Sequence, residues 1–157
     1  MNVVCCFIKE QFFADHKNYI KMLDPDNITK QAHRTYLCLK ITADSNDYYI
    51  PLRNNLGADV RPYGRIGHSV PSRSRSDAGL DFRYALIIND SSYIEIPETP
   101  KIPNAQLNRI TNDYYKIEHE FKVYLNGFRK ALRKGRIQLE ALYRESSLIN
   151  FANELSL

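Results

Sequence analysis

The strongest hydrophobic pattern in the chain lies in its second half, where apolar side chains recur at alternating spacings of three and four. The series is Leu107, Ile110, Tyr114, Ile117, Phe121, Tyr124, Phe128 and Ala131. This spacing places one apolar stripe along a helix, so we expect a helix over about residues 105–134, capped by Asn104 and ended by Gly135. The aromatic side chains are bulky for a coiled-coil seam, which favours packing against a sheet.

The first half of the chain shows short runs of β-branched and aromatic residues instead. The runs that predict strands are residues 3–8, 36–42, 48–50, 79–88 and 93–96. The turn at residues 44–47 folds the second run back on the third as a hairpin. Because a hairpin brings its two outer ends together, we expect Arg34 and Arg53 to be neighbours.

The remaining segments have weaker patterns. A short helix through Tyr19 and Leu23, with Asp15 as its N-cap, is predicted before the hairpin. Residues 56–78 are rich in Gly, Arg, Ser and Pro and are predicted to form a long loop, a kind of segment that is usually functional. Residues 137–143 are predicted to be extended, and residues 147–155 to form a final short helix.

Composition indicates one globular domain that spans residues 1–157, with 43% hydrophobic and 25% charged residues. Three cysteines without C-x-x-C spacing argue against a disulfide framework or a zinc site and fit a reducing cytoplasm. No run has the length of a membrane span, and the N-terminal apolar run is too short for a signal peptide. The four histidines lack metal-ligand spacing, so we expect neither a metal nor another cofactor.

The net charge of +4 is concentrated in two regions. Six arginines face three aspartates between residues 53 and 83, and nine basic residues face three acidic ones between residues 101 and 136. Such regions favour a polyanionic partner such as RNA, although basic helix faces are often only solvated. The residues that we predict to contact RNA on this basis are Asn55, Arg61, Arg65, Arg73, Arg75, Arg83, Lys122, Arg129, Lys130 and Arg133.

Candidate chemistry begins where the third strand ends at Pro51, because Arg53, Asn54 and Asn55 follow at once. An arginine fork and asparagine amides suit a phosphate backbone, while an ordinary turn is the alternative for Asn-Asn-Leu-Gly. His68 is the candidate for proton transfer because histidines ordinarily exchange protons near neutral pH, although a surface histidine without a catalytic role is equally compatible.

These groups predict a catalytic set of Arg34, Arg53, Asn54 and His68. The set fits metal-free RNA cleavage, in which the 2′-hydroxyl of the substrate attacks the phosphate and Arg53 holds the developing oxyanion. A noncatalytic RNA-binding protein is the alternative, because the same cations would also grip phosphates without cutting.

The order of several short motifs resembles the toxins of type III toxin-antitoxin systems, the ToxN and AbiQ family, and especially its TenpN branch. The motifs are residues 18–23, Ile50-Pro51-Leu52, the basic loop, the strand opening at residues 79–82 and the long helix. The resemblance spans the chain from about Phe12 onward. The positions that match the family's site residues are Tyr19, Arg34, Pro51, Leu52, Arg53 and Asn54. The resemblance implies that Tyr19 is a further RNA contact.

The resemblance implies an α+β fold with a small antiparallel β-barrel-like core, similar to MazF and Kid, on which a long amphipathic helix and shorter helices pack. It also implies a cytoplasmic, metal-independent, sequence-preferring endoribonuclease that leaves a 2′,3′-cyclic phosphate and a 5′-hydroxyl, and that both processes and is inhibited by its RNA antitoxin. The implied partners are cellular or phage RNA substrates and a repeat-derived RNA antitoxin in a closed protein–RNA assembly, and the implied role is phage defence. ToxN has Thr-Ser where this chain has Arg53-Asn54 and a lysine near the position of Leu56, and the TenpN pattern is Arg-Ser.

Overall fold

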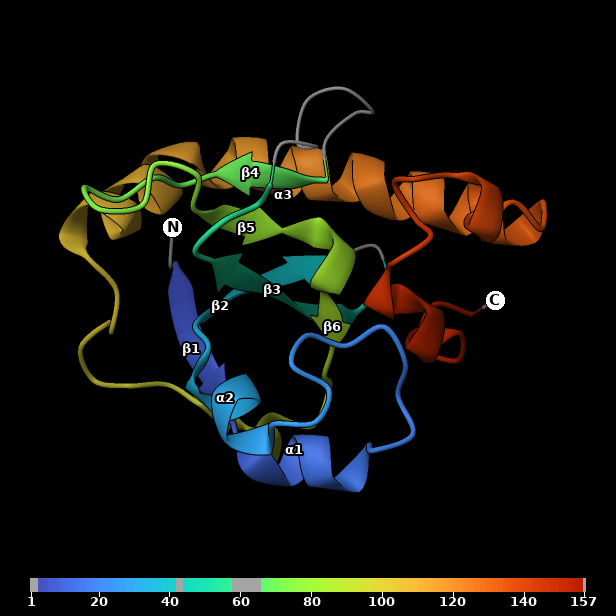
Figure 1. Ribbon diagram of the computed structural model, residues 1–157, viewed down its shortest axis with the longest axis horizontal. Coiled ribbons are helices and arrows are strands. Elements are labelled where there is room, and N and C mark those ends of the chain that lie inside the picture. The colour runs from blue at the N-terminus through green and yellow to red at the C-terminus, as the bar shows by residue number, and fades with distance from the viewer. Residues whose placement is uncertain (1–2, 42–43, 58–65, 157) are drawn as a thin grey trace.

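The chain folds as an antiparallel sheet with a long helix along one side (Figure 1). The computed structural model describes residues 3–41, 44–57 and 66–156. The strands are β1 (Val4–Ile8), β2 (Tyr36–Ile41), β3 (Asn46–Arg53), β4 (Gly67–Ser69), β5 (Gly79–Asp81), β6 (Leu86–Ile87) and β7 (Ile94–Glu95). The helices are α1 (Glu10–Asp15), α2 (Ile28–His33) and α3 (Asn104–Arg133), with 3-10 turns η2 (Phe82–Tyr84), η3 (Ser91–Tyr93), η4 (Ile137–Leu139) and η5 (Ser147–Phe151).

Strand β3 lies at the centre of the sheet, whose order is β4-β5-β3-β2-β1-β7, and β6 also pairs with β3. The predicted hairpin is the β2–β3 pair, in register from Tyr36 opposite Pro51 to Ile41 opposite Asn46. Among the described residues the two end strands, β4 and β7, do not pair with each other, so the sheet is open. The predicted combination of an antiparallel sheet with a long helix is therefore confirmed, whereas a closed barrel is not.

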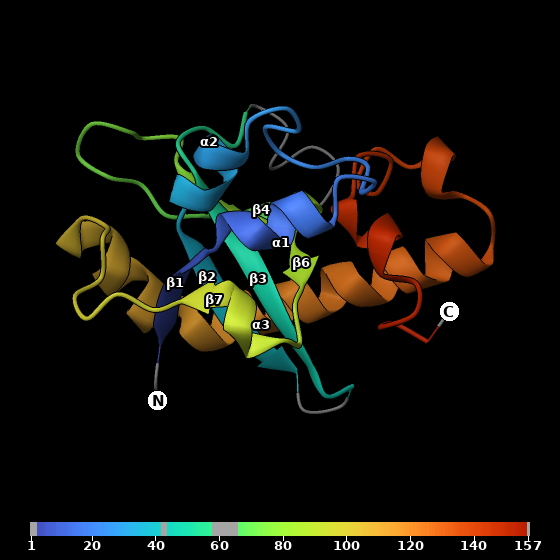
Figure 2. The same cartoon turned by 90° about the horizontal axis from the view of Figure 1, so that it is seen from below.

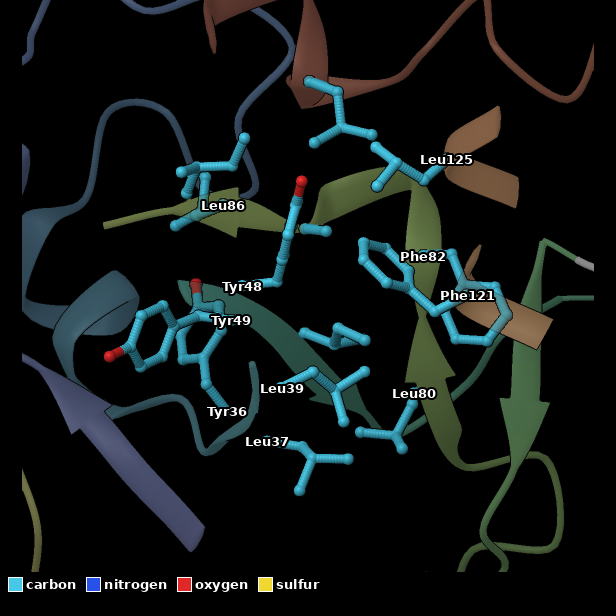
Figure 3. Packing of buried hydrophobic residues seen from close by; sticks show 14 of the residues in the cluster. Tyr36, Leu37, Leu39, Tyr48, Tyr49, Leu80, Phe82, Leu86, Phe121 and Leu125 are labelled. Atoms are coloured by element: carbon cyan, nitrogen blue, oxygen red, sulfur yellow. The ribbon is translucent and has the colours of Figure 1, made fainter. Parts of the chain in front are cut away.

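Helix α3 confirms the prediction from the hydrophobic stripe and packs on the sheet. Its N-cap is Pro103, however, and Asn104, the predicted cap, is its first residue. Its apolar residues Ile110, Ile117, Phe121 and Phe128 are almost fully buried. The ring of Phe121 meets the ring of Tyr48 edge-on, with 5.1 Å between their centroids (Figure 3). Both ribbon views show α3 continuing past the edge of the sheet toward the C-terminal segment (Figure 2). No helix in the described ranges is both long and apolar enough to span a membrane.

The segment before the hairpin differs from the prediction. The helix lies earlier, at α1, because Phe12 and Phe13 provide its buried face, so Asp15 ends this helix and does not cap the next one. The stretch from Tyr19 to Leu23 is not helical, and Lys21 in its middle has a φ of 58°. A second short helix, α2, was not predicted. Its N-cap is Asn27, whose side chain accepts a hydrogen bond from the backbone N–H of Lys30.

Three other segments also differ from the prediction. The run at residues 79–88 is broken by η2, because the side chain of Asp81 accepts the backbone N–H of Arg83 and turns the chain. The predicted loop at residues 56–78 contains β4, which pairs with β5. Residues 137–143 are not extended but contain η4 and turns, and the final helix is the 3-10 turn η5.

Candidate nucleic-acid interface

The end of the β2–β3 hairpin brings Arg34 next to the end of β3, as the sequence predicts. The backbone N–H of Leu52 donates to the carbonyl of Thr35 at 2.9 Å, which extends the ladder by one residue. Continuing the same register places Arg34 opposite Arg53. The Arg34 guanidinium also donates through Nη1 to the Leu52 carbonyl at 3.5 Å. Arg34 is thereby fixed against the backbone just before Arg53 and Asn54.

A pocket of about 340 Å³ lies beyond this strand end. Three cationic side chains line it, namely Lys30, Arg34 and Lys101, together with His33 and Asn54. Ile102, Pro103 and Gln106 also line it, so the N-terminal end of α3 forms one wall. Because the N-terminus of a helix carries a partial positive charge, the wall and the cations favour the same ligand, an anion such as a phosphate group. We name this cavity the basic pocket.

Asp24 is the acidic partner of two residues that line the basic pocket. Its carboxylate lies 2.9 Å from Nη2 of Arg34 and 3.3 Å from Nζ of Lys30. Burial alone would raise the pKa of Asp24, but the hydrogen bonds and charges of Arg34 and Lys30 outweigh it and hold the pKa below its usual value. One carboxylate therefore faces two of the cations, and Lys101 adds a third positive charge to the pocket.

The Asn54 segment is held in place by close contacts with β4 and β5. Leu56 donates its backbone N–H to the carbonyl of Asp77 at 2.9 Å. The Leu56 side chain lies over Gly67 and Gly79, where an added Cβ would meet it. A Cβ at either glycine would also collide with a backbone carbonyl oxygen of the neighbouring strand. The glycines thus permit the close approach that fixes the chain just after Asn54.

Arg53 belongs to a different cluster from Arg34. Its Nη1 donates to Asp81 at 3.0 Å, and Arg83 donates to the same fully buried carboxylate through Nε at 3.0 Å and Nη2 at 2.9 Å. Both guanidinium groups lie over the ring of Tyr84, at 5.2 Å for Arg53 and 5.5 Å for Arg83. Arg53 is not among the residues that line the basic pocket, and 28% of its side chain is exposed.

His68 lies on β4, not in a loop, and its side chain points away from Arg53. Cross-strand pairing aligns His68 with Leu80 and Leu52, whereas Arg53 aligns with Gly79. Since successive side chains along a strand emerge on opposite faces, these two rows point to opposite sides of the sheet. The expectation that Arg53 and His68 lie close together in one site is therefore wrong. His68 does not line the basic pocket either.

On its own face of the sheet, His68 lies between two carboxylates of α3. Nδ1 is 2.8 Å from a carboxylate oxygen of Glu120, and Nε2 is 2.9 Å from one of Asp113. The histidine is 5% exposed. Asp113 and Glu120 are seven residues apart, which is two helical turns, so their shared helix face was visible in the sequence but was not recognised. Among the described residues no group of three or more His, Cys, Asp and Glu side chains could hold a metal ion.

Three residues of the basic pocket were also not recognised in the sequence. They are Lys30, His33 and Lys101. Lys30 lies three residues before His33, a spacing that places both on one side of α2, and Arg34 follows directly as the C-cap of this helix. The signal that could have found Lys30 and His33 is the Asn27 cap, which marks the start of this helix.

Tyr19 and Asn55, two of the predicted RNA contacts, lie outside the basic pocket. Tyr19 stacks on His16, with 4.7 Å between ring centroids, and both line a separate pocket of about 400 Å³ that includes Gln31 of α2. Burial raises the pKa of Tyr19, and the charge of Glu154 adds to this shift. The side chain of Asn55 accepts the backbone N–H of Gly57 at 2.7 Å, so this asparagine does form the local turn that was the alternative.

The other predicted RNA contacts are spread over the surface. Arg73 and Arg75 are exposed in the turn closed by the bridge between Ser72 and Arg75. On α3, Lys122 pairs with Glu118 and Arg129 pairs with Asp44, each at 3.2 Å. Lys130 and Arg133 are exposed, and Lys130 lines a further pocket of about 330 Å³ with Lys134 and Arg136. Arg61 and Arg65 lie outside the described residues.

Comparison with known proteins gives one informative match at the level of structure. No protein-family model matches the chain, and no curated protein matches it. A solved structure of ToxN, described as "A processed non-coding RNA regulates a bacterial antiviral system", superimposes with a TM-score of 0.57 over 92% of this chain and 96% of that one. This chain has the ToxN fold. At 14% sequence identity the likeness shows the fold alone, and it confirms the resemblance to the type III toxins at that level.

Proposed function

We propose that this chain is an endoribonuclease toxin of a type III toxin-antitoxin system. It acts as a single domain over residues 1–157, in the cytoplasm and without a metal ion. The observation that carries the proposal is the convergence of Lys30, Arg34, Lys101 and Asn54 on one pocket, in a chain with the ToxN fold. The pocket volume of about 340 Å³ is at the lower end of the usual range for ligand sites and suits a phosphate with part of a nucleotide.

The proposed reaction uses groups of the RNA itself as nucleophile and leaving group. The 2′-oxygen attacks the adjacent phosphorus and loses its proton, the O2′–P bond forms, and the P–O5′ bond breaks as the 5′-oxygen gains a proton. The products are a 2′,3′-cyclic phosphate and a 5′-hydroxyl. The protein has to orient the 2′-hydroxyl, stabilise the charge on the pentacoordinate phosphorus and assist the two proton transfers.

Within this proposal, Arg34, Lys30 and Lys101 stabilise the phosphate oxygens, and the Asn54 amide orients the 2′-hydroxyl. Arg53 holds the next phosphate along the strand, because Nε and Nη2 of its guanidinium make no hydrogen bond to any described residue. The proton transfer predicted for His68 stays a prediction, and its contacts with two carboxylates of α3 favour a role in packing this helix on the sheet instead.

The proposed inhibitor is a small structured RNA made from a repeat, held with the toxin in a closed assembly. The exposed cations outside the lining of the basic pocket support this partner, because they offer phosphate contacts over a wide surface. They are Arg73, Arg75, Lys130 and Arg133. Release of the toxin from this RNA during infection would give the protein a role in phage defence.

The proposal is tested by a time course of the purified protein on mixed RNA in EDTA, with analysis of the product ends. We expect discrete cleavage products with 2′,3′-cyclic phosphate and 5′-hydroxyl ends. Absence of products, or ends of another kind, would contradict the proposed reaction. Cleavage that requires a divalent cation would instead indicate a metal-dependent nuclease.

A noncatalytic RNA-binding protein is the second candidate, and one observation favours it. The cations around Lys130 lie at the other end of α3 from the basic pocket, where they can grip phosphates without contributing to cleavage. A protein of this kind would bind RNA with an affinity that falls steeply with salt and would release no product. Replacing Lys130 and Arg133 together by alanine should then lower the slope of log affinity against log salt by about 2.

A further inference from the structure

His33 is the histidine that the structure places at the basic pocket. It is the last residue of α2, it is exposed, and it lines the pocket beside Arg34. Neither the catalytic set predicted from the sequence nor the structural comparison assigns it a role. Its position gives an imidazole access to the same space in which a phosphate would lie between Lys30 and Lys101.

The hydrogen bond of His33 fixes which ring nitrogen can accept a proton. Nδ1 lies 2.8 Å from the backbone carbonyl oxygen of Thr29. A carbonyl oxygen only accepts hydrogen bonds, so Nδ1 carries the hydrogen and donates it. In the neutral ring the lone pair is then on Nε2, which makes no hydrogen bond or ion pair with any described residue. A general base needs this arrangement, in which a hydrogen bond at one nitrogen orients the ring and the other nitrogen can accept a proton.

Two other histidines show what distinguishes His33. His68 has a carboxylate oxygen within 2.9 Å of each ring nitrogen and is buried, so neither nitrogen is available to a substrate. His16 makes the same bond as His33, from Nδ1 to the carbonyl four residues earlier at 2.7 Å, but it lines the pocket of Tyr19 and not the basic pocket. In His33 the ring is oriented by a hydrogen bond at Nδ1 and also lines a pocket that contains cationic side chains.

We propose that His33 is the general base of the RNA cleavage reaction. This inference rests on the proposed function. Nε2 of His33 takes the proton from the 2′-hydroxyl as the O2′–P bond forms, and the 5′-oxygen takes a proton from an ammonium group of the pocket, Lys30 or Lys101, as the P–O5′ bond breaks. Exchange with solvent then returns the imidazole and the amine to their starting states. Atoms and charge balance without any further reactant.

The charged groups around His33 come from both of its sides. Lys30, Arg34 and Lys101 line the basic pocket together with it. Lys9, Glu10 and Glu95 face it from a neighbouring pocket that His33 also lines. Any change in the pH dependence of cleavage must therefore be compared in variants that leave these six groups in place.

The test compares His33→Ala and His33→Asn with the wild-type protein in the RNA cleavage assay. Asparagine can still donate a hydrogen bond to the Thr29 carbonyl, so it separates loss of the base from loss of this bond. We expect kcat to fall by about 10²–10⁴-fold in both variants, with KM nearly unchanged. The rise of kcat on the acid side of the pH profile should also disappear. Added imidazole should partly restore cleavage by His33→Ala.

His16→Ala and His16→Asn are the matched controls, because His16 has the same hydrogen bond in another pocket. They should cleave RNA at the wild-type rate, and melting temperatures should show that all four variants are folded. Wild-type kcat and an unchanged acid limb in His33→Asn would overturn the role of His33 while leaving the proposed function intact. A wild-type protein that binds RNA but cleaves none would overturn both.

Discussion

Two charged clusters of the molecule have opposite character. On the α3 side, His68 lies between Asp113 and Glu120, and both ring nitrogens contact carboxylate oxygens. At the open end of β3, Lys30 and Arg34 share one carboxylate, and Lys101 adds another positive charge to the same pocket. The first cluster is internally paired, while the second has more cations than anions.

This difference separates a packing role from a binding role. Paired polar groups that are sealed from water hold elements together and leave little for a ligand to contact. An excess of cations at an accessible pocket is stabilised when an anion arrives. The sequence alone could not show this distinction, because the partners of a histidine or an arginine side chain depend on the fold and not on the residue type.

The largest effect is expected from breaking the buried cluster. His68→Leu leaves Glu120 and Asp113 without the imidazole between them, and removal of one partner from a buried ionic contact costs about 3–5 kcal/mol. Chemical denaturation should show this loss in the free energy of unfolding. Arg109→Ala is the control, because Arg109 pairs with the same Asp113 at 3.8 Å but is half exposed, and it should change stability by less than about 1 kcal/mol. Equal effects of the two substitutions would contradict the packing role.

The next largest effect is expected at the basic pocket, on activity. Arg34→Ala removes the guanidinium that faces the phosphate site, and loss of one such group typically lowers kcat by about 10²–10³-fold. Single-turnover cleavage of RNA measures this. Lys21→Ala provides a comparison, since Lys21 forms an ion pair with Glu145 and does not line the pocket. If both variants cleaved at the wild-type rate, Arg34 would have no part in the reaction.

The smallest effect concerns the dependence of stability on pH. The contacts of Asp24 with Arg34 and Lys30 hold its pKa below the usual value, so they stabilise the folded protein above the ordinary aspartate range, near pH 4, and are lost as the pH falls through the lowered pKa. Asp24→Asn should therefore cost about 1 kcal/mol at neutral pH and almost nothing in strong acid. Asparagine tolerates the φ of 48° at this position. If Asp24→Asn were still less stable than the wild-type protein in strong acid, the loss of stability would have to come from something other than these ion pairs.

The parts of the fold that could be predicted are those with long local patterns. The apolar stripe of α3 repeats over many turns, and the β2–β3 hairpin has a clear turn between two strand-forming runs. The hairpin also gave the opposed backbone positions of Arg34 and Arg53, because this pairing follows from connectivity alone.

The parts that could not be predicted depend on contacts between distant segments. Helix α2 has only six residues, too few to be stable alone, so its existence depends on packing with α1 and β1. The partners of His68 lie 45 and 52 residues away in sequence, and which face of β4 carries the histidine depends on the register with β5. Most of the basic pocket was missed for the same reason, since it joins α2, β3 and the start of α3.

The contact of Leu56 with Gly67 and Gly79 has a further consequence for the affinity of the pocket. The segment after Asn54 is fixed by groups that an RNA need not touch, namely a backbone hydrogen bond to Asp77 and two strand glycines. An incoming RNA therefore meets a chain segment whose backbone is already held in place, and little backbone conformational entropy is lost when it binds. A side chain at position 79 would collide with Leu56 and so disturb the segment after Asn54, without removing any side chain that lines the basic pocket.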